Sequence, residues 1–176
     1  MKVTESGIKG VFIIEPDVYE DDRGFFMETF HIERYRKLLG INLDFVQDNI
    51  SRSSKNVLRG MHFQKNYPQG KIVKASRGEI LDVVVDLRKE SPTFGTWESF
   101  RLSEKNKLQV WIPPGFAHGF LVMSDSADFE YKCTEYYHPE DELCLMWNDP
   151  EVAIDWTINE PIVTGKDKKG LSLKDL

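Results

Sequence analysis

The sequence has little cysteine, no long apolar run and no excess of positive charge. Its two cysteines, Cys133 and Cys144, lack the CxxC spacing of redox motifs and zinc ribbons, so we expect buried thiols and neither a disulfide framework nor a zinc site. No apolar stretch reaches the roughly 20 residues that cross a bilayer. The first residues, MKVTESG, are not followed by the apolar segment of a signal peptide. We therefore expect a cytoplasmic protein with no membrane partner.

The charge balance argues against one large class of partners. The net charge is −6, whereas proteins that bind nucleic acids usually present a basic surface. A small anionic ligand remains compatible with this charge, because a few arginines and lysines in one cleft bind phosphate inside an acidic protein.

A series of short strands dominates the pattern of apolar residues. The 176 residues suit one domain spanning 1–176, and no internal repeat or glycine-rich nucleotide fingerprint is present. Apolar residues at helical spacing predict a helix over 32–39, with Gly40 as its C-terminal stop. The many short strands, separated by turn signals at intervals of about ten residues, predict an all-β sandwich or barrel with few helices. The expected strands are 10–15, 25–30, 71–76, 80–87, 97–102, 109–112, 119–123 and 129–135.

The segment 80–87 places two carboxylates on one strand face. Asp82 and Asp86 alternate with Leu81, Val83 and Val85, so they share a face that either lines a polar cavity or is solvated. For each aspartate taken alone, solvation is the preferred interpretation. The last residues, 164–176, are charged and interrupted by glycines, and their composition alone predicts a frayed tail.

Two histidine motifs carry the strongest chemical signal. RGMHFQ (59–64) and PPGFAHGF (113–120) resemble the two motifs of the cupin superfamily, a double-sheet jelly roll. The first motif departs from the metal-binding pattern, since Gln64 stands where a second histidine is usual and Lys71 lies in the region of an acidic ligand. Two imidazoles beside a cation make a poor metal site, so we expect His62 and His118 to line a metal-free cavity.

A closer resemblance covers nearly the whole chain. The sequence is similar to the dTDP-4-dehydrorhamnose 3,5-epimerase family of RmlC-like cupins from about residue 11 to residue 175. The motifs that carry this resemblance are DDRGFFMETF (21–30), FVQDN (45–49), LRGMHFQ (58–64), PQGKIV (68–73), VVVDLRKESPTFGTW (83–97), IPPGFAHGF (112–120), YKCTEYYHP (131–139), WNDP (147–150) and LSLKD (171–175).

The resemblance implies an enolate mechanism without a cofactor or metal. A 4-keto group acidifies the hydrogens on C3 and C5 of the sugar, so epimerisation needs a base, an acid on the opposite face and a stabilised enolate. By resemblance, His62 is the base, Asp175 orients it, Lys71 stabilises the enolate and Tyr131 is the proton donor. His118 is a second histidine near the sugar.

The resemblance also implies where the dTDP-linked 4-keto-6-deoxy sugar binds. Tyr137 matches an aromatic residue that stacks on thymine, and the arginines suit the diphosphate. The other implied binding residues are Arg23, Glu28, Gln47, Asp48, Asn49, Arg59, Glu142 and Lys174. The family is typically dimeric, which implies a homodimer in which the strand around 25–28 crosses to the partner subunit.

Several other interpretations are open from the sequence. Without the resemblance, Lys71 would be a solvated strand lysine, Tyr131 a core aromatic and Asp175 a tail residue. Base and acid together favour epimerisation at both C3 and C5, but an epimerase acting at one position on a related nucleotide sugar is the main alternative. A non-catalytic sugar-nucleotide-binding cupin is a third possibility, and a metal-dependent cupin enzyme is disfavoured by Gln64 and Lys71. His31 and His138 are expected to be structural.

Overall fold

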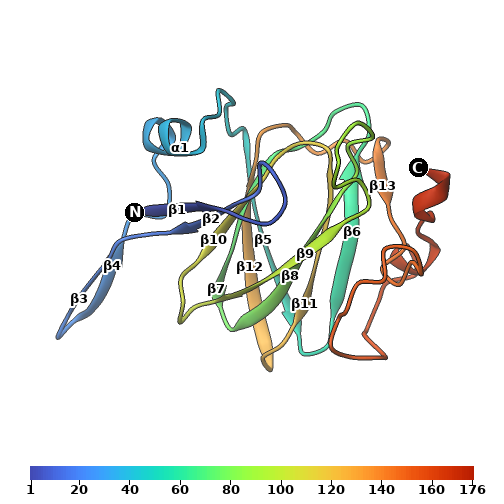
Figure 1. Ribbon diagram of the computed structural model, residues 1–176. Coiled ribbons are helices and arrows are strands. Elements are labelled where there is room, and N and C mark those ends of the chain that lie inside the picture. The colour runs from blue at the N-terminus through green and yellow to red at the C-terminus, as the bar shows by residue number, and fades with distance from the viewer.

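The computed structural model describes residues 1–176 as two antiparallel sheets packed face to face, with a separate hairpin at one side (Figure 1). The six-stranded sheet runs β1 (Lys2–Glu5), β2 (Phe12–Glu15), β10 (Gln109–Ile112), β7 (Lys71–Arg77), β12 (Ser126–Cys133), β5 (Gln47–Ser54). The five-stranded sheet runs β13 (Glu142–Cys144), β6 (Leu58–Gln64), β11 (Phe116–Val122), β8 (Glu79–Asp86), β9 (Trp97–Ser103). The expectation of an all-β fold of two packed sheets with few helices is confirmed.

The main core fills the space between the two sheets. Strand alternation sends Ile80 and Val84 of β8 inward, toward Val73 and Phe129 of the opposite sheet, and all four are buried. Leu81, Val83 and Val85 face the other way, into a second apolar cluster outside the five-stranded sheet. The five-stranded sheet is thus buried on both faces.

Asp82 and Asp86 correct one interpretation of the sequence. Both are 0% exposed, so they do not lie on a solvated sheet face. Asp86 accepts hydrogen bonds from Arg88, Ser91 and Thr93. Asp82 points toward His118 in the space between the sheets.

The C-terminal residues are packed, which also differs from the expectation of a frayed tail. Val152 and Trp156 cover the outer face of the five-stranded sheet together with Leu173 and Leu176. The 3₁₀ turns η1 (Asp167–Lys169) and η2 (Leu173–Asp175) lie in this segment, and Leu171 bridges to Leu145. Composition did not predict this packing, because a few apolar residues hold an otherwise charged segment against the sheet.

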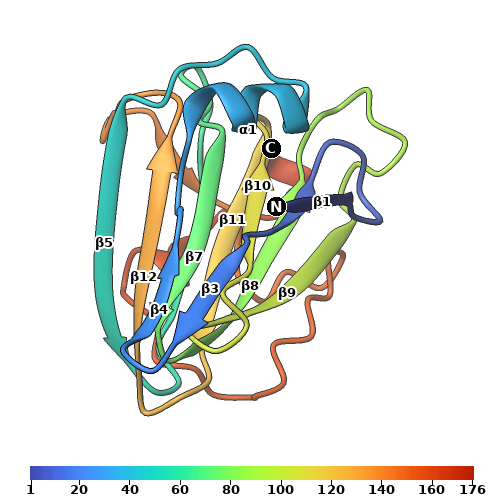
Figure 2. The same ribbon diagram turned by 90° about the vertical axis from the view of Figure 1, so that its left-hand side faces the viewer.

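The helix α1 (Ile32–Leu39) covers the outer face of the six-stranded sheet (Figure 2). Its start is fixed by His31, whose Nδ1 accepts from the Arg34 N–H, and it ends at Gly40 in the left-handed conformation. Tyr35 and Leu39 are buried against Trp111. The predicted helix and its stop are confirmed, and His31 has a structural role.

The hairpin of β3 (Val18–Asp21) and β4 (Gly24–Met27) projects from the body of the subunit (Figure 1). Phe25 and Phe26 on it are exposed by 60% and 70%.

The extended segment predicted over 25–30 ends early, at Met27, while the other predicted strands are present with shifted bounds. Five strands were not predicted from the sequence: β1, β3, β5, β6 and β13. No helix is long and apolar enough to cross a membrane.

Candidate functional site

A polar cavity of about 360 Å³ opens between the two sheets. Strands of both sheets contribute to its wall, so side chains far apart in sequence face one another across it. The lining residues are Gln47, Asn49, Ser51, Arg59, His62, Gln69, Lys71, His118, Gly119, Phe120, Phe129, Tyr131, Tyr137 and Glu142. Nine of these were predicted from the sequence to bind or act on the substrate.

The two motif histidines lie opposite each other on neighbouring strands. His62 of β6 pairs in register with His118 of β11, and the register shifts between His118 and Phe120. Gly60 has a φ of +128°, and a Cβ there would lie 2.5 Å from the Cα of Gly119. This close approach of two strands explains the glycines beside both histidines.

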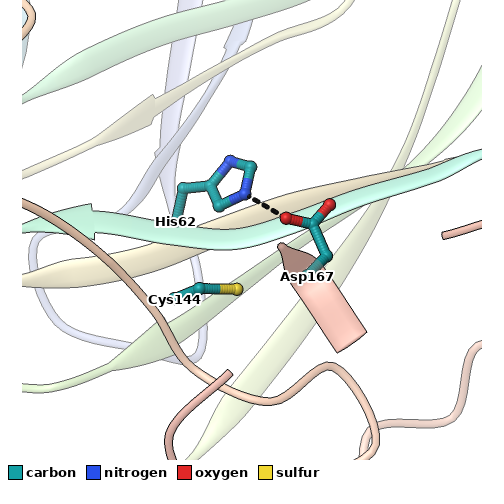
Figure 3. A group of neighbouring side chains, drawn as sticks. All are labelled: His62, Cys144 and Asp167. Atoms are coloured by element: carbon teal, nitrogen blue, oxygen red, sulfur yellow. Dashed lines mark hydrogen bonds and ion pairs between the residues drawn. The ribbon is translucent and has the colours of Figure 1, made fainter. Parts of the chain in front are cut away.

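His62 is hydrogen-bonded to Asp167, not to Asp175 (Figure 3). The distance from His62 Nε2 to Asp167 Oδ1 is 2.7 Å, and the N–H of Gly60 donates to Asp167 Oδ2 at 3.4 Å. Asp175 instead accepts from the Ser172 hydroxyl at 2.6 Å and lies outside the cavity. The prediction that Asp175 orients His62 is therefore wrong: the segment 164–176 supplies the carboxylate, but eight residues earlier.

The setting of Asp167 favours its charged form. Burial alone would raise the pKa of Asp167, but the hydrogen bonds from His62 and Gly60 and the charge of the imidazole outweigh it and hold the pKa below its usual value. A carboxylate at this position accepts a hydrogen bond from the protonated Nε2 of His62. The other ring nitrogen, Nδ1, is then left without a proton and can accept one. Nδ1 lies 3.9 Å from Glu142, a residue of the cavity wall.

His118 has its own buried carboxylate. Its Nε2 lies 2.7 Å from Asp82 Oδ1, and both side chains are buried. The second oxygen of Asp82 has no hydrogen-bond partner. Burial lowers the pKa of the nearby Lys71, and the negative charge of Asp82 offsets this only in part.

Lys71 lies in the cavity wall on β7, directly across the ladder from Cys133. Loss of hydration lowers the pKa of Lys71 below its usual value, and Cys133 and Asp82 offset this only in part. A cation held in such surroundings interacts strongly with any negative charge that develops beside it.

The lowered pKa of Lys71 predicts that Lys71→Met stabilises the fold at neutral pH. Lys71 binds a proton more tightly in the unfolded chain than in the folded protein, so its positive charge lowers the free energy of unfolding. This destabilisation is complete below the pKa of the folded state and disappears as the pH rises to the pKa of the unfolded state, about 10.4. Denaturant unfolding should therefore give Lys71→Met a higher unfolding free energy than the unaltered protein at neutral pH, with a difference that narrows at pH 9–10.

The matched control for this prediction is Lys132→Met. Lys132 is on the neighbouring strand and pairs with Asp48 in an exposed ion pair. We expect that variant to change stability by no more than about 0.5 kcal/mol at either pH. A Lys71→Met variant that is less stable at neutral pH would show that the charge of Lys71 supports the fold.

Tyr131 approaches the cavity from the sheet opposite His62. It lies on β12, beside Phe129, with ring centroids 5.2 Å apart. Burial raises the pKa of the Tyr131 hydroxyl, so the phenol stays protonated at neutral pH. The cavity thus has an imidazole on one sheet and a protonated phenol on the other.

Polar groups line the mouth of the cavity. Gln47 accepts a hydrogen bond from the backbone N–H of Tyr137 and donates to Asn49. The Tyr137 hydroxyl donates to Glu142 at 3.1 Å, and Glu142 also pairs with Lys166. These contacts place an exposed aromatic ring next to amide groups, which suits the binding of a flat polar ring.

Four other predicted binding residues lie outside the cavity. Asp48 points to the opposite face of β5 from Gln47 and Asn49, because neighbouring residues in a strand alternate. Lys174 pairs with Glu151 at 2.7 Å on the outer surface, so the structure does not bring it to this site. Arg23 pairs with Asp21 at the tip of the projecting hairpin, and Glu28 pairs with Arg34.

Some cavity residues were not predicted. Ser51 could have been found from its period-two spacing with Gln47 and Asn49, and Gln69 from its place beside Lys71. Phe120 and Phe129 form the apolar part of the wall. Asp167 gave no signal in the sequence beyond its charge.

Gln64, at a usual cupin metal position, has its side chain engaged with backbone groups. Gln64 donates to the carbonyl oxygens of Tyr67 and Tyr136 and accepts from the N–H of His138, so it holds loops together outside the cavity. His138 stacks on Tyr67 and has a structural role. One group of metal-ligand type exists elsewhere, formed by His62, Cys144 and Asp167.

Comparison with known proteins shows the family of the chain. The family model of dTDP-4-dehydrorhamnose 3,5-epimerase matches residues 5–175. The dTDP-4-dehydrorhamnose 3,5-epimerase of Pseudomonas aeruginosa is 50% identical over 99% of this chain and 97% of its own length. The dTDP-4-dehydrorhamnose 3-epimerase of Streptomyces niveus is 39% identical over 99% of this chain and 85% of its own length.

A solved structure gives the same result. The 3,5-epimerase RmlC of Legionella pneumophila, in complex with dTDP-4-keto-L-rhamnose, superposes with a TM-score of 0.96 at 52% identity. The match covers 98% of this chain and 93% of that one. With family model, sequence and fold in agreement over almost the whole length, the chain belongs to the dTDP-4-dehydrorhamnose 3,5-epimerase family, a family of isomerases with a cupin-type fold.

Proposed function

We propose that the protein epimerises dTDP-4-dehydro-6-deoxy-D-glucose at both C3 and C5 to give dTDP-4-dehydro-L-rhamnose. The observation that carries this proposal is the placement of His62 and Tyr131 on opposite sheets of one cavity, with Lys71 in its wall. Inversion of a carbon needs a base on one face and an acid on the other, and these residues supply both.

The steps follow from the residues. Nδ1 of His62 takes the proton from the carbon next to the 4-keto group, and the electron pair moves to the keto oxygen. The ammonium of Lys71 stabilises this enolate in a site with little water. The hydroxyl of Tyr131 then donates its proton to the opposite face of the carbon, and the electrons return from the oxygen. Solvent restores the protonation of both residues.

The nucleotide end of the substrate fits the mouth of the cavity. The exposed ring of Tyr137 is available for stacking on the base, beside the amides of Gln47 and Asn49. Arg59 lines the same cavity and is suited to the diphosphate through its planar fork of N–H groups.

The protein acts as a homodimer in this proposal. The hairpin β3–β4 presents two exposed phenylalanines and Arg23, whose side chain is 89% exposed, on a projection whose strands pair only with each other. Such a hairpin is suited to covering the cavity of the partner subunit and bringing Arg23 to the diphosphate. Light scattering should give twice the subunit mass, and a fully active monomer would contradict this arrangement.

One experiment tests the function. The protein, pretreated with a chelator, is incubated with dTDP-4-keto-6-deoxyglucose in deuterated water while NMR follows C3 and C5. We expect exchange at both carbons at the same rate as without the chelator, since His62, Lys71 and Tyr131 need no metal. Exchange at one carbon would instead indicate a single-position epimerase, and no exchange would indicate a non-catalytic binding protein. Activity lost to the chelator would overturn the metal-free mechanism.

Tyr131→Phe tests the role of the acid. The variant lacks the proton for the opposite face, so product formation should fall roughly 10²-fold, whereas loss of deuterium from labelled substrate should fall less than about tenfold. Both rates are followed by NMR on the same sample. The control is Tyr136→Phe, which removes an exposed hydroxyl outside the cavity. Equal losses in both rates would contradict the role of Tyr131 as the donor.

A further inference from the structure

A thiol lies next to the His62–Asp167 pair. Cys144 of β13 is 7% exposed, and it has no part in the proposed proton transfer. A nitrogen of His62, the sulfur of Cys144 and an oxygen of Asp167 all lie within 4.8 Å of one another (Figure 3). Imidazole, thiolate and carboxylate are the three kinds of side chain that bind zinc.

The fold brings these three groups together from distant parts of the sequence. Cys144 pairs in register with His62, and the neighbouring Met61 and Leu145 exchange both backbone hydrogen bonds. His62 and Cys144 therefore form a non-hydrogen-bonded pair of the ladder, where side chains on the same face are closest. Asp167 reaches the pair from the turn η1.

The Cys144 thiol is free to take a metal. Its only side-chain hydrogen bond is to the carbonyl oxygen of Leu145 at 3.4 Å, and a thiol is a weak donor. Burial and the nearby Asp167 raise the pKa of Cys144 to about 12, so at neutral pH it is a neutral thiol when no cation is bound. A zinc ion would replace the thiol proton, which leaves to solvent.

The three atoms must draw into zinc geometry by different amounts: the sulfur, within 4.8 Å of the other two atoms, has to come to roughly 3.6 Å from each, while the nitrogen and oxygen have to separate slightly. Zinc bonds of about 2.0–2.1 Å to nitrogen and oxygen, at a tetrahedral angle, place those two atoms roughly 3.3 Å apart. His62 Nε2 and Asp167 Oδ1 now lie 2.7 Å apart, joined by a hydrogen bond. Separating them by about half an ångström would let the ion take the place of the shared proton, with water as the fourth ligand.

We infer that His62, Cys144 and Asp167 form an inhibitory site for Zn²⁺. A zinc ion bound there holds Nε2 of His62 and removes the carboxylate from its role as hydrogen-bond acceptor. The site differs from the usual cupin metal position, where Gln64 is engaged with backbone groups. Because zinc at this site inhibits, the metal-free protein is the active form. A chelator therefore does not lower its activity in the experiment above.

Cobalt is the probe for this site, since it takes the place of zinc and its thiolate complexes absorb light. Titration of the metal-free protein with Co²⁺ should give one equivalent bound, with a sulfur-to-cobalt charge-transfer band in the near ultraviolet. One equivalent of Zn²⁺ should abolish the band. In Cys144→Ser the band should be absent, and Zn²⁺ affinity measured by competition with a chromogenic chelator should fall at least about tenfold.

The matched control is Cys133→Ser. Cys133 is the other buried thiol, lies on the six-stranded sheet and has Lys71 rather than a carboxylate beside it. The band should persist in that variant. A band that is lost in Cys133→Ser and kept in Cys144→Ser would overturn the assignment, as would a protein that binds no Co²⁺ at millimolar concentration. Near-ultraviolet circular dichroism without metal shows whether each variant is folded.

The metal-binding result does not depend on the proposed reaction. If the protein is inactive on dTDP-4-keto-6-deoxyglucose but shows the cobalt band, the metal site is supported and the proposed reaction is contradicted. In the active enzyme, stoichiometric Zn²⁺ should lower the exchange rate at least tenfold, and a chelator should restore it. The Asp167→Asn variant should lose Zn²⁺ affinity by a similar factor to Cys144→Ser.

Discussion

His62→Ala is expected to lower deuterium exchange at both C3 and C5 by roughly 10²–10⁴-fold, the usual contribution of a general base. In the proposed reaction, each epimerisation begins with the same imidazole, so neither carbon should retain normal exchange. NMR of the substrate in deuterated water measures both carbons in one sample. If exchange at one carbon survived at its normal rate, another residue would have to be the base for that carbon.

Two further variants separate chemistry from folding. His62→Asn keeps a polar group that can hydrogen-bond with Asp167, so its fold should be intact while exchange remains as low as in His62→Ala. His138→Ala removes an imidazole that stacks on Tyr67 outside the cavity, and its exchange rate should stay normal. A comparable loss of activity in His138→Ala would show that the effect of His62→Ala is not specific to the cavity.

Asp167→Asn is expected to lower exchange roughly 10²-fold or more, although the change is nearly isosteric. The carboxylate accepts from Nε2 of His62 through Oδ1 and from the Gly60 N–H through Oδ2. In the variant, the amide oxygen should stay with the Gly60 N–H, so the NH₂ group faces His62. Nε2 must then be the acceptor and the ring proton moves to Nδ1, which can no longer accept a proton from the substrate.

The control for this prediction is Asp175→Asn. Asp175 is on the same segment and its carboxylate accepts only from Ser172, away from the cavity. The exchange rate of that variant should remain within about twofold of normal, because neither His62 nor the cavity wall changes. Normal exchange in Asp167→Asn together with a large loss in Asp175→Asn would mean that the segment rearranges when substrate binds.

The sequence predicted the sheets and most of the cavity, because those parts depend on local patterns. Alternation of apolar residues identified the strands that carry Lys71 and Tyr131, whereas the strand predicted over 119–123 began one residue after His118. The family motifs supplied the expected roles of all three residues. Asp48 shows where motif matching fails: the resemblance covers consecutive residues, but a strand turns every second side chain away from the site.

The partner of His62 could not be read from the sequence for a different reason. The segment 164–176 contains Asp167 and Asp175 with similar charged neighbours, and no periodic pattern separates them. Only the packing of Leu171 and Leu173 against the five-stranded sheet decides which carboxylate reaches the imidazole. Long-range packing of this kind has no local signature.

The stacked rings of Phe120 and Phe129 join the two sheets at the wall of the cavity, with centroids 4.3 Å apart. His62 belongs to one sheet and Tyr131 to the other, and packed sheets lie ordinarily about 10 Å apart. In the proposed reaction, the distance between base and acid therefore depends on the size of two hydrocarbon side chains that take no part in proton transfer. Evolution of this enzyme toward a bulkier or smaller sugar would have to act on that spacing as well as on the residues that touch the ring.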